Sequence, residues 1–205
     1  MNIKLLVLSL ATILTGCVNT NGPATYRYSL ISTPAEPLIA KTHKKTNLVI
    51  KISPIQTKQS LMSSHIVYVN TSKNGQNNYA HNRWSDTPSK LLEALWIEEI
   101  ENNSYFKAVV PSHFISKADY VLESNLYDFT QYLYDDGSSN GVIKLRLYLI
   151  DNKTKEIISS QEMLSITPIE EQNAAGTVAA LNTAAIQINK KLITWLESNK
   201  SLLRE

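Results

Sequence analysis

The chemistry that this sequence indicates most strongly is the attachment of lipid to one thiol. Cys17, the only cysteine of the chain, directly follows Leu14, Thr15 and Gly16 at the end of a short apolar N-terminal stretch. Lys4 supplies the positive charge that begins a secretory signal peptide. In a bacterial lipoprotein the cysteine thiol receives a diacylglycerol, the chain is cut before the cysteine, and the new amine receives an N-acyl chain. The pattern therefore predicts a signal peptide over residues 1–16 and a lipid anchor on Cys17.

The residues after Cys17 separate this anchor from the folded part of the chain. A transmembrane helix needs about 20 consecutive apolar residues, whereas polar residues begin again at Asn19. Residues 17–25 are mostly small, polar or Pro/Gly, so they cannot bury much apolar area and we expect a flexible tether. Residue 18 is Val, not the Asp that retains lipoproteins at the inner membrane in enterobacteria-like sorting. We expect the anchor to lie in the outer membrane, with the body facing the periplasm.

Composition limits the classes of function. Removal of residues 1–16 takes away Lys4 alone among the charged residues, which leaves 19 basic against 18 acidic side chains. This near-neutral balance gives no indication of nucleic-acid binding. With 43% hydrophobic residues the chain is long enough for one domain with its own core. No second cysteine is available for a disulfide, so packing must stabilise the domain.

The sequence lacks the residue patterns of common catalytic and metal sites. The histidines at His43, His65, His81 and His113 do not show a metal-ligand spacing. The loop over 135–141 has carboxylates beside glycines, but it does not follow the spacing of a calcium-binding loop. Motifs for a nucleophile elbow, a phosphate-binding loop and a dinucleotide site are absent. We expect a non-enzymatic protein without a metal, whose only attached groups are the acyl chains on the cysteine.

Hydrophobic periodicity predicts an α+β domain over residues 26–200. The predicted strands are 26–30, 48–52, 66–69, 78–81, 106–110, 118–134, 142–150 and 157–166. The predicted helices are 88–102, with Pro88 at its first position, and 169–199, with an apolar stripe at Leu181, Ala185, Ile188, Leu192 and Trp195. This order predicts an antiparallel or mixed sheet packed against two main helices in a single domain.

Aromatic residues beside polar loops indicate a surface for contact with a partner. Asn74 and Gly75 predict the turn of a hairpin, and Tyr68, Tyr79 and Trp84 lie on or next to its arms. Aromatic side chains ringed by polar residues often form contact surfaces. The alternative is that each ring covers the core or a sheet edge. We predict that these three residues belong to a partner-binding face.

Several short motifs also occur in an order that is similar to a known family. The motifs are the lipobox at Cys17, Tyr26-Arg27-Tyr28-Ser29-Leu30, the strand ending in Pro54, His65-Ile66-Val67-Tyr68, Arg83-Trp84-Ser85-Asp86-Thr87-Pro88, Ala118-Asp119-Tyr120-Val121-Leu122, Asp128-Phe129 and Trp195-Leu196. From residue 26 to 197 the chain resembles the auxiliary lipoproteins of ABC-type and MCE-protein lipid transport systems, the family of the paraquat-inducible lipoprotein PqiC. The motifs within the domain are short, and their order of appearance carries the resemblance.

The resemblance implies a non-enzymatic partner in lipid transport. It implies that an MCE-domain protein anchored in the inner membrane spans the periplasm, and that the lipoprotein docks it at the outer membrane. Because MCE proteins form rings, the lipoprotein could itself be a homo-oligomer. Two alternatives stay open: a lipid-binding module, which would need a large apolar cavity, and a lipopolysaccharide-assembly or secretion lipoprotein, since a fold does not determine a function.

Overall fold

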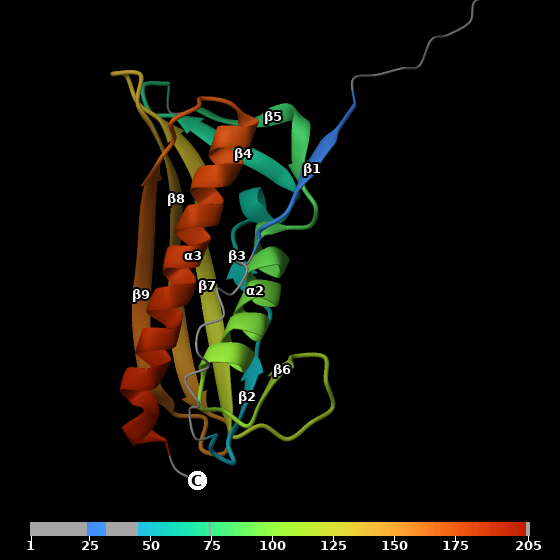
Figure 1. Ribbon diagram of the computed structural model, residues 1–205, viewed down its shortest axis with the longest axis vertical. Helices are drawn as coiled ribbons and strands as arrows, with labels where there is room; N and C mark the ends of the chain where they lie inside the picture. The colour runs from blue at the N-terminus through green and yellow to red at the C-terminus, as the bar shows by residue number, and fades with distance from the viewer. Residues whose placement is uncertain (1–23, 32–44, 74, 204–205) are drawn as a thin grey trace, which may run out of the picture.

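A computed structural model describes residues 24–31, 45–73 and 75–203. The predicted signal peptide and the predicted lipidation site at Cys17 lie outside the described residues, as does most of the predicted tether. Figure 1 shows a curled sheet with two helices on one of its faces.

The longest strand, β7 (Tyr120–Leu133), is the middle of the sheet. On one edge it pairs antiparallel with β8 (Ser139–Asp151), which pairs antiparallel with β9 (Ile157–Pro168). The predicted three-stranded meander is therefore confirmed. Alternation in β8 sets the two faces, because Ile143, Leu145, Leu147 and Leu149 are fully buried, whereas the residues between them are only partly buried.

The other edge of β7 pairs in parallel with successive short strands of the preceding chain. These are β2 (Val49–Ile52), β3 (Gln56–Thr57) and β4 (His65–Asn70). Pro54 lies between the first two and lacks the N–H that a continuous ladder needs, which fits the interruption there. The two-residue strand β3 was not predicted, because it is too short to show a periodicity. The 3-10 turn η1 (Gln59–Leu61) follows it.

The remaining strands extend the sheet on the same side of β7. The hairpin partner of β4 is β5 (Gly75–Trp84), which pairs in parallel with β1 (Tyr26–Tyr28). The partner of β2 is β6 (Ala108–Pro111), also parallel. The predicted hairpin is confirmed, and the sheet is mixed.

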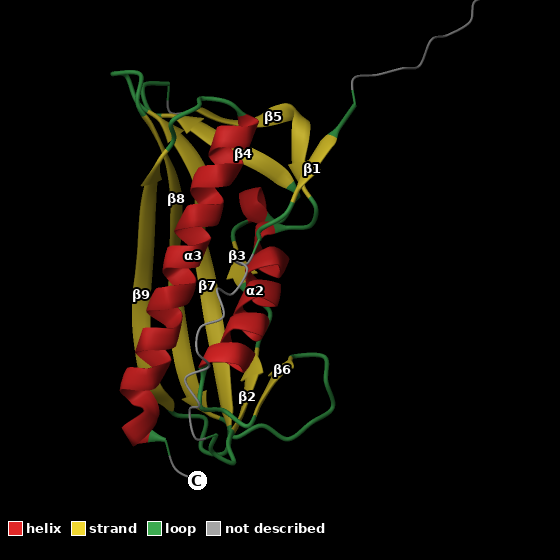
Figure 2. Ribbon diagram, viewed as in Figure 1, coloured by secondary structure: helices red, strands yellow, loops and turns green. Residues whose placement is uncertain are grey.

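Helices α2 (Pro88–Asn103) and α3 (Ala174–Asn199) cover one face of the sheet (Figure 2). The predicted start of the second helix at residue 169 is wrong. Asn173 caps α3 by accepting a hydrogen bond from Gly176 N at 2.9 Å, and Ile169 N instead donates to Ser139 O at 2.8 Å. Strand β8 begins at Ser139 and not at the predicted residue 142. The predicted loop over 135–141 is therefore also too long. The short helix η2 (Lys200–Leu202) follows α3.

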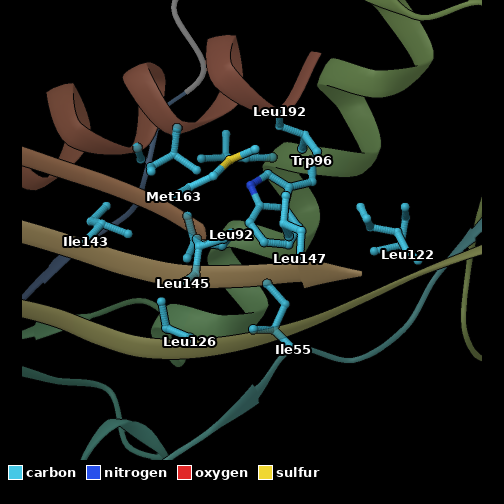
Figure 3. Close-up of a cluster of buried hydrophobic side chains, with 14 of the residues drawn as sticks. Ile55, Leu92, Trp96, Leu122, Leu126, Ile143, Leu145, Leu147, Met163 and Leu192 are labelled. Atoms are coloured by element: carbon cyan, nitrogen blue, oxygen red, sulfur yellow. The ribbon is translucent and has the colours of Figure 1, made fainter. Parts of the chain in front are cut away.

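The core lies between the helices and the inner face of the sheet. Trp96 of α2 and Leu192 of α3 are fully buried, and Met163 of β9 is 2% exposed (Figure 3). Every residue of the predicted stripe on α3 is buried. The prediction of one α+β domain with a mixed sheet and two helices is confirmed.

Small residues bring the start of α3 close to the sheet. A Cβ placed on Gly141 of β8 would lie 3.2 Å from Ala180 Cβ, so the two backbones can approach only because these side chains are absent or small. Ala180 is 5% exposed, whereas its neighbour Ala179 is exposed.

We expect Ala180→Leu to lower the free energy of unfolding by about 1–3 kcal/mol, since the larger side chain must displace the sheet or the helix. Ala179→Leu is the matched control on the solvent side of the same turn, and its effect should be within about 0.5 kcal/mol. Urea unfolding of both variants measures this. Equal effects for the two variants would contradict the close approach.

Candidate functional site

The predicted partner-binding residues lie in the β4–β5 region, but the structure gives them different environments. The Tyr68 ring of β4 meets the Tyr79 ring of β5 edge-on, with centroids 5.3 Å apart. Both side chains are partly buried. They therefore form one aromatic pair on the hairpin.

Trp84, the third predicted residue, belongs to the core. Its side chain is 1% exposed, and its ring meets Phe129 of β7 at 5.4 Å between centroids. An indole buried to this extent has almost no surface that a partner could contact. Trp84 is therefore removed from the predicted partner-binding face. The sequence misled here because a Trp at the end of a polar strand is compatible with either location.

Tyr79 connects the hairpin to α3 through buried polar groups. Its hydroxyl donates to Gln131 Oε1 at 2.8 Å, and Thr177 Oγ1 lies 2.9 Å from the same oxygen. Gln131 is fully buried, and its Nε2 has no hydrogen-bond partner among the described residues. These three residues come from β5, β7 and α3, so they hold the hairpin against the first turn of that helix. This connection could not be read from the sequence, because its members are far apart in the chain.

The outward face of the sheet forms a second candidate surface, which the sequence analysis did not identify as one. Glu162 of β9 lies 3.3 Å from Lys144 Nζ and 3.4 Å from Arg146 Nη2 of β8. The Lys144 ammonium, together with Arg146, holds the pKa of the Glu162 carboxyl below its ordinary value. Leu164 and Ile166 lie on the same face of β9 and are 42% and 52% exposed. The alternation of β8 was the available signal, since it places one basic side chain after another on the side away from the core.

The described part of the chain also has two shallow hollows. The first, about 230 Å³ in volume, lies along β7 and is lined by residues that include Gln56, Glu123 and Tyr148. The second, about 300 Å³, lies between the segment after β1 and α2 and is lined by residues that include Leu30 and Leu95. Ligand pockets commonly measure about 300–1,000 Å³, so both hollows are at or below the lower end of that range.

Residues 24–31, 45–73 and 75–203 offer neither a metal site nor a membrane-spanning helix. Within these ranges, His, Asp and Glu side chains do not gather into groups of three or more that could hold a metal ion. Neither α2 nor α3, nor any shorter helix in the described part of the chain, is long and apolar enough to span a membrane.

Comparison with protein families supplies the assignment that the geometry alone does not. Residues 28–192 match the family described as the ABC-type transport auxiliary lipoprotein component. The chain belongs to this family. The match includes all the described strands from β2 to β9 as well as α2 and most of α3. The resemblance inferred from the motif order is confirmed at this level.

Solved structures support the fold. Protein XCC0632 from Xanthomonas campestris, of the DUF330 family, is 17% identical with a TM-score of 0.74, and the match covers 87% of this chain and 97% of that one. A second, uncharacterized protein is 13% identical with a TM-score of 0.63, over 84% of this chain and 99% of that one. At these identities the likeness concerns the fold alone.

A curated relative is the uncharacterized protein bll6063 from Bradyrhizobium diazoefficiens. It is 28% identical over 112 residues, which are 55% of this chain and 30% of the relative. The chain thus matches less than a third of that protein's length. What is shown for this chain is its membership of the family described as the ABC-type transport auxiliary lipoprotein component.

Substitutions in the hairpin separate its structural residues from its surface residues. Trp84→Ala should lower the free energy of unfolding by about 3–5 kcal/mol because it leaves a cavity beside Phe129. Tyr79→Phe should lower it by about 1–2 kcal/mol, since Gln131 and Thr177 lose a buried partner. Tyr26→Phe is the control, because the Tyr26 side chain is 64% exposed. Thermal and urea unfolding measure these values, and a stable Trp84→Ala protein would contradict the buried position.

Proposed function

We propose that this protein is an outer-membrane lipoprotein that docks a periplasm-spanning MCE-domain protein during transport of lipids between the membranes. The observation that carries the proposal is the family match over residues 28–192, which assigns an auxiliary role in ABC-type transport. The lipobox at Cys17 adds a means of anchoring, and Val18 favours the outer membrane. The role is non-enzymatic: the protein holds a transport component in place.

The proposed anchor would keep the body close to the membrane. Acyl chains on Cys17 give a stable attachment, since more than one chain is needed for that. Residues 18–25 would extend up to roughly 26 Å at about 3.3 Å per residue. Within this distance the anchor raises the effective concentration of the domain for a partner at the same membrane, without any additional contact.

We propose that the Tyr68–Tyr79 pair contributes to the partner contact, without Trp84. Tyr68 offers a partly exposed ring on a hairpin that also presents polar side chains. The buried bonds of Tyr79 to Gln131 fix the hairpin before a partner arrives, so little conformational freedom would be lost on binding.

A homo-oligomer is also part of the proposal. Strand pairing between two copies along the free edge of β9 would require a hydrogen bond with α3 to break. Lys191 Nζ of that helix already donates to Leu164 O of β9. The outward sheet face, with its mixed charges and exposed Leu164 and Ile166, is the less obstructed surface for a second copy. The hollow along β7 and the hollow beside α2 are each at most about 300 Å³, so neither of them supports the alternative of a lipid-binding module.

The anchor can be tested with one substitution. We expect Cys17→Ala to prevent acylation and to release the protein from the membrane fraction, since the thiol is the only site for the diacylglycerol. Mass spectrometry of the N-terminal peptide and membrane fractionation measure this. A wild-type peptide that begins at residue 17 without acyl chains would contradict the anchor.

The partner can be tested by purifying the native protein from crosslinked envelopes and identifying what accompanies it by mass spectrometry. We expect recovery of an MCE-domain protein, with about tenfold less from Tyr68→Ala, because hot-spot aromatics commonly contribute more than about 1.4 kcal/mol. Tyr127→Ala is the matched control, since Tyr127 is an exposed tyrosine of the same sheet. Recovery of lipopolysaccharide-assembly or secretion components instead would exclude the proposed role.

A further inference from the structure

An apolar tip projects from the segment between β6 and β7. In this segment, residues 112–118, Phe114 is 52% exposed and Ile115 is fully exposed at 107%. Every other residue from 113 to 117 is exposed as well. Two adjacent apolar side chains at the tip of a projecting loop are unfavourable in water, so this loop is a candidate for contact with an apolar phase.

The loop is held in shape by bonds at its base. Phe114 N donates to Pro111 O at 3.1 Å, and Ser116 N donates to Phe114 O at 3.0 Å. Lys51 Nζ of β2 donates to Phe114 O at 3.2 Å, and the His113 ring meets the Phe114 ring edge-on at 5.0 Å. At the other end, Asn152 Nδ2 donates to Ala118 O at 2.8 Å. These contacts hold both ends of the loop, so the position of its tip on the domain is fixed.

The surroundings of the tip are polar and partly cationic. Lys51 and Lys117 flank it, and the nearby Asp119 carboxylate accepts the backbone N–H of Val49 at 2.8 Å. A protein-binding patch normally offers a broader apolar area. A small apolar tip flanked by lysines is suited to the surface of a bilayer. Phe114 and Ile115 can enter the acyl region while the lysine ammonium groups stay among the lipid headgroups.

The position of the loop relative to the start of the domain suggests which bilayer this is. The order of strands places β1 and β6 on one side of β7, and β8 and β9 on the other. In Figure 1 the chain enters β1 at the upper right, and the loop after β6 projects to the lower right. Both therefore lie along the same long side of the molecule, opposite β9.

We propose that the loop over 112–118 is a second membrane contact, in which Phe114 and Ile115 insert into the bilayer that holds the Cys17 lipid. This rests on the proposed lipid anchor. Because β1 begins near one end of that long side and the loop lies near the other, this contact would lay the body along the membrane with β9 facing away from it. The loop thus sets the orientation in which the domain meets its partner.

The test uses the full lipidated protein in vesicles of phosphatidylethanolamine and phosphatidylglycerol. Ser116→Cys, labelled with an environment-sensitive dye, reports on the tip without changing Phe114 or Ile115. The acylated Cys17 leaves no other thiol to react. Ile157→Cys is the matched control, because this residue is 60% exposed and lies at the start of β9, opposite the proposed contact side.

We expect blue-shifted emission at position 116 that lipid-borne quenchers reduce, and neither effect at position 157. Adding Ile115→Asp should abolish the quenching at 116 and leave the unfolding midpoint unchanged, since the side chain is exposed. Emission typical of water at 116 overturns the proposal. So does a blue shift without lipid quenching, which would mean that a protein, including a second copy, covers the loop. A protein that does not float with vesicles overturns the anchor itself, whereas one that floats with position 116 in water overturns only the loop contact.

Discussion

The arrangement of this domain depends on both edges of β7 being paired along most of its length. One edge carries β8, and the other carries three short strands that follow one another in the preceding chain. A register shift between Leu126 and Asp128 lets both Leu126 and Phe129 face the core, although they are three residues apart. The added residue also bends the strand, which fits the curl seen in Figure 1. The helices can therefore cover one face of a curved sheet while the other face stays in contact with solvent.

Near its end, β7 changes from apolar to polar on the core side. Leu122, Leu126 and Phe129 are buried apolar residues, and they are followed by the buried Gln131. Burying the Gln131 amide costs free energy unless its polar atoms form hydrogen bonds. The hydroxyls of Tyr79 and Thr177 both donate to its Oε1. Bonds of this kind depend on direction, whereas apolar contacts do not. The polar end of β7 consequently fixes how the β4–β5 hairpin sits against α3, and the apolar remainder supplies most of the stability.

The sequence was sufficient to predict the elements whose signal is local. The alternation in β8, the stripe on α3 and the hairpin predicted from Asn74-Gly75 each follow from periodicity or turn chemistry, and the structure has the strand, the helix and the antiparallel pairing of β4 with β5. The parallel pairing of β2, β3 and β4 with β7 could not be predicted in the same way, because at least β5, α2 and β6 lie between these segments in the chain. The same limit applies to the candidate site. Tyr68, Tyr79 and Trp84 resemble each other in type and setting, yet only the tertiary packing distinguishes the buried indole from the partly exposed ring. Cys17 differs, because its predicted modification is read from a linear motif.

The division of the sheet into two faces bears on how an auxiliary component could work. A domain with its helices on one face leaves the other with a basic and acidic cluster at Lys144, Arg146 and Glu162 and with exposed apolar side chains beside it. Because this cluster is solvent-exposed, its ion pairs contribute little to the stability of the fold. Conversely, the residues that stabilise the fold are turned inward and are unavailable to a partner. Side chains on the outward face and in the loops can therefore be substituted without disturbing the packing between β7 and the helices.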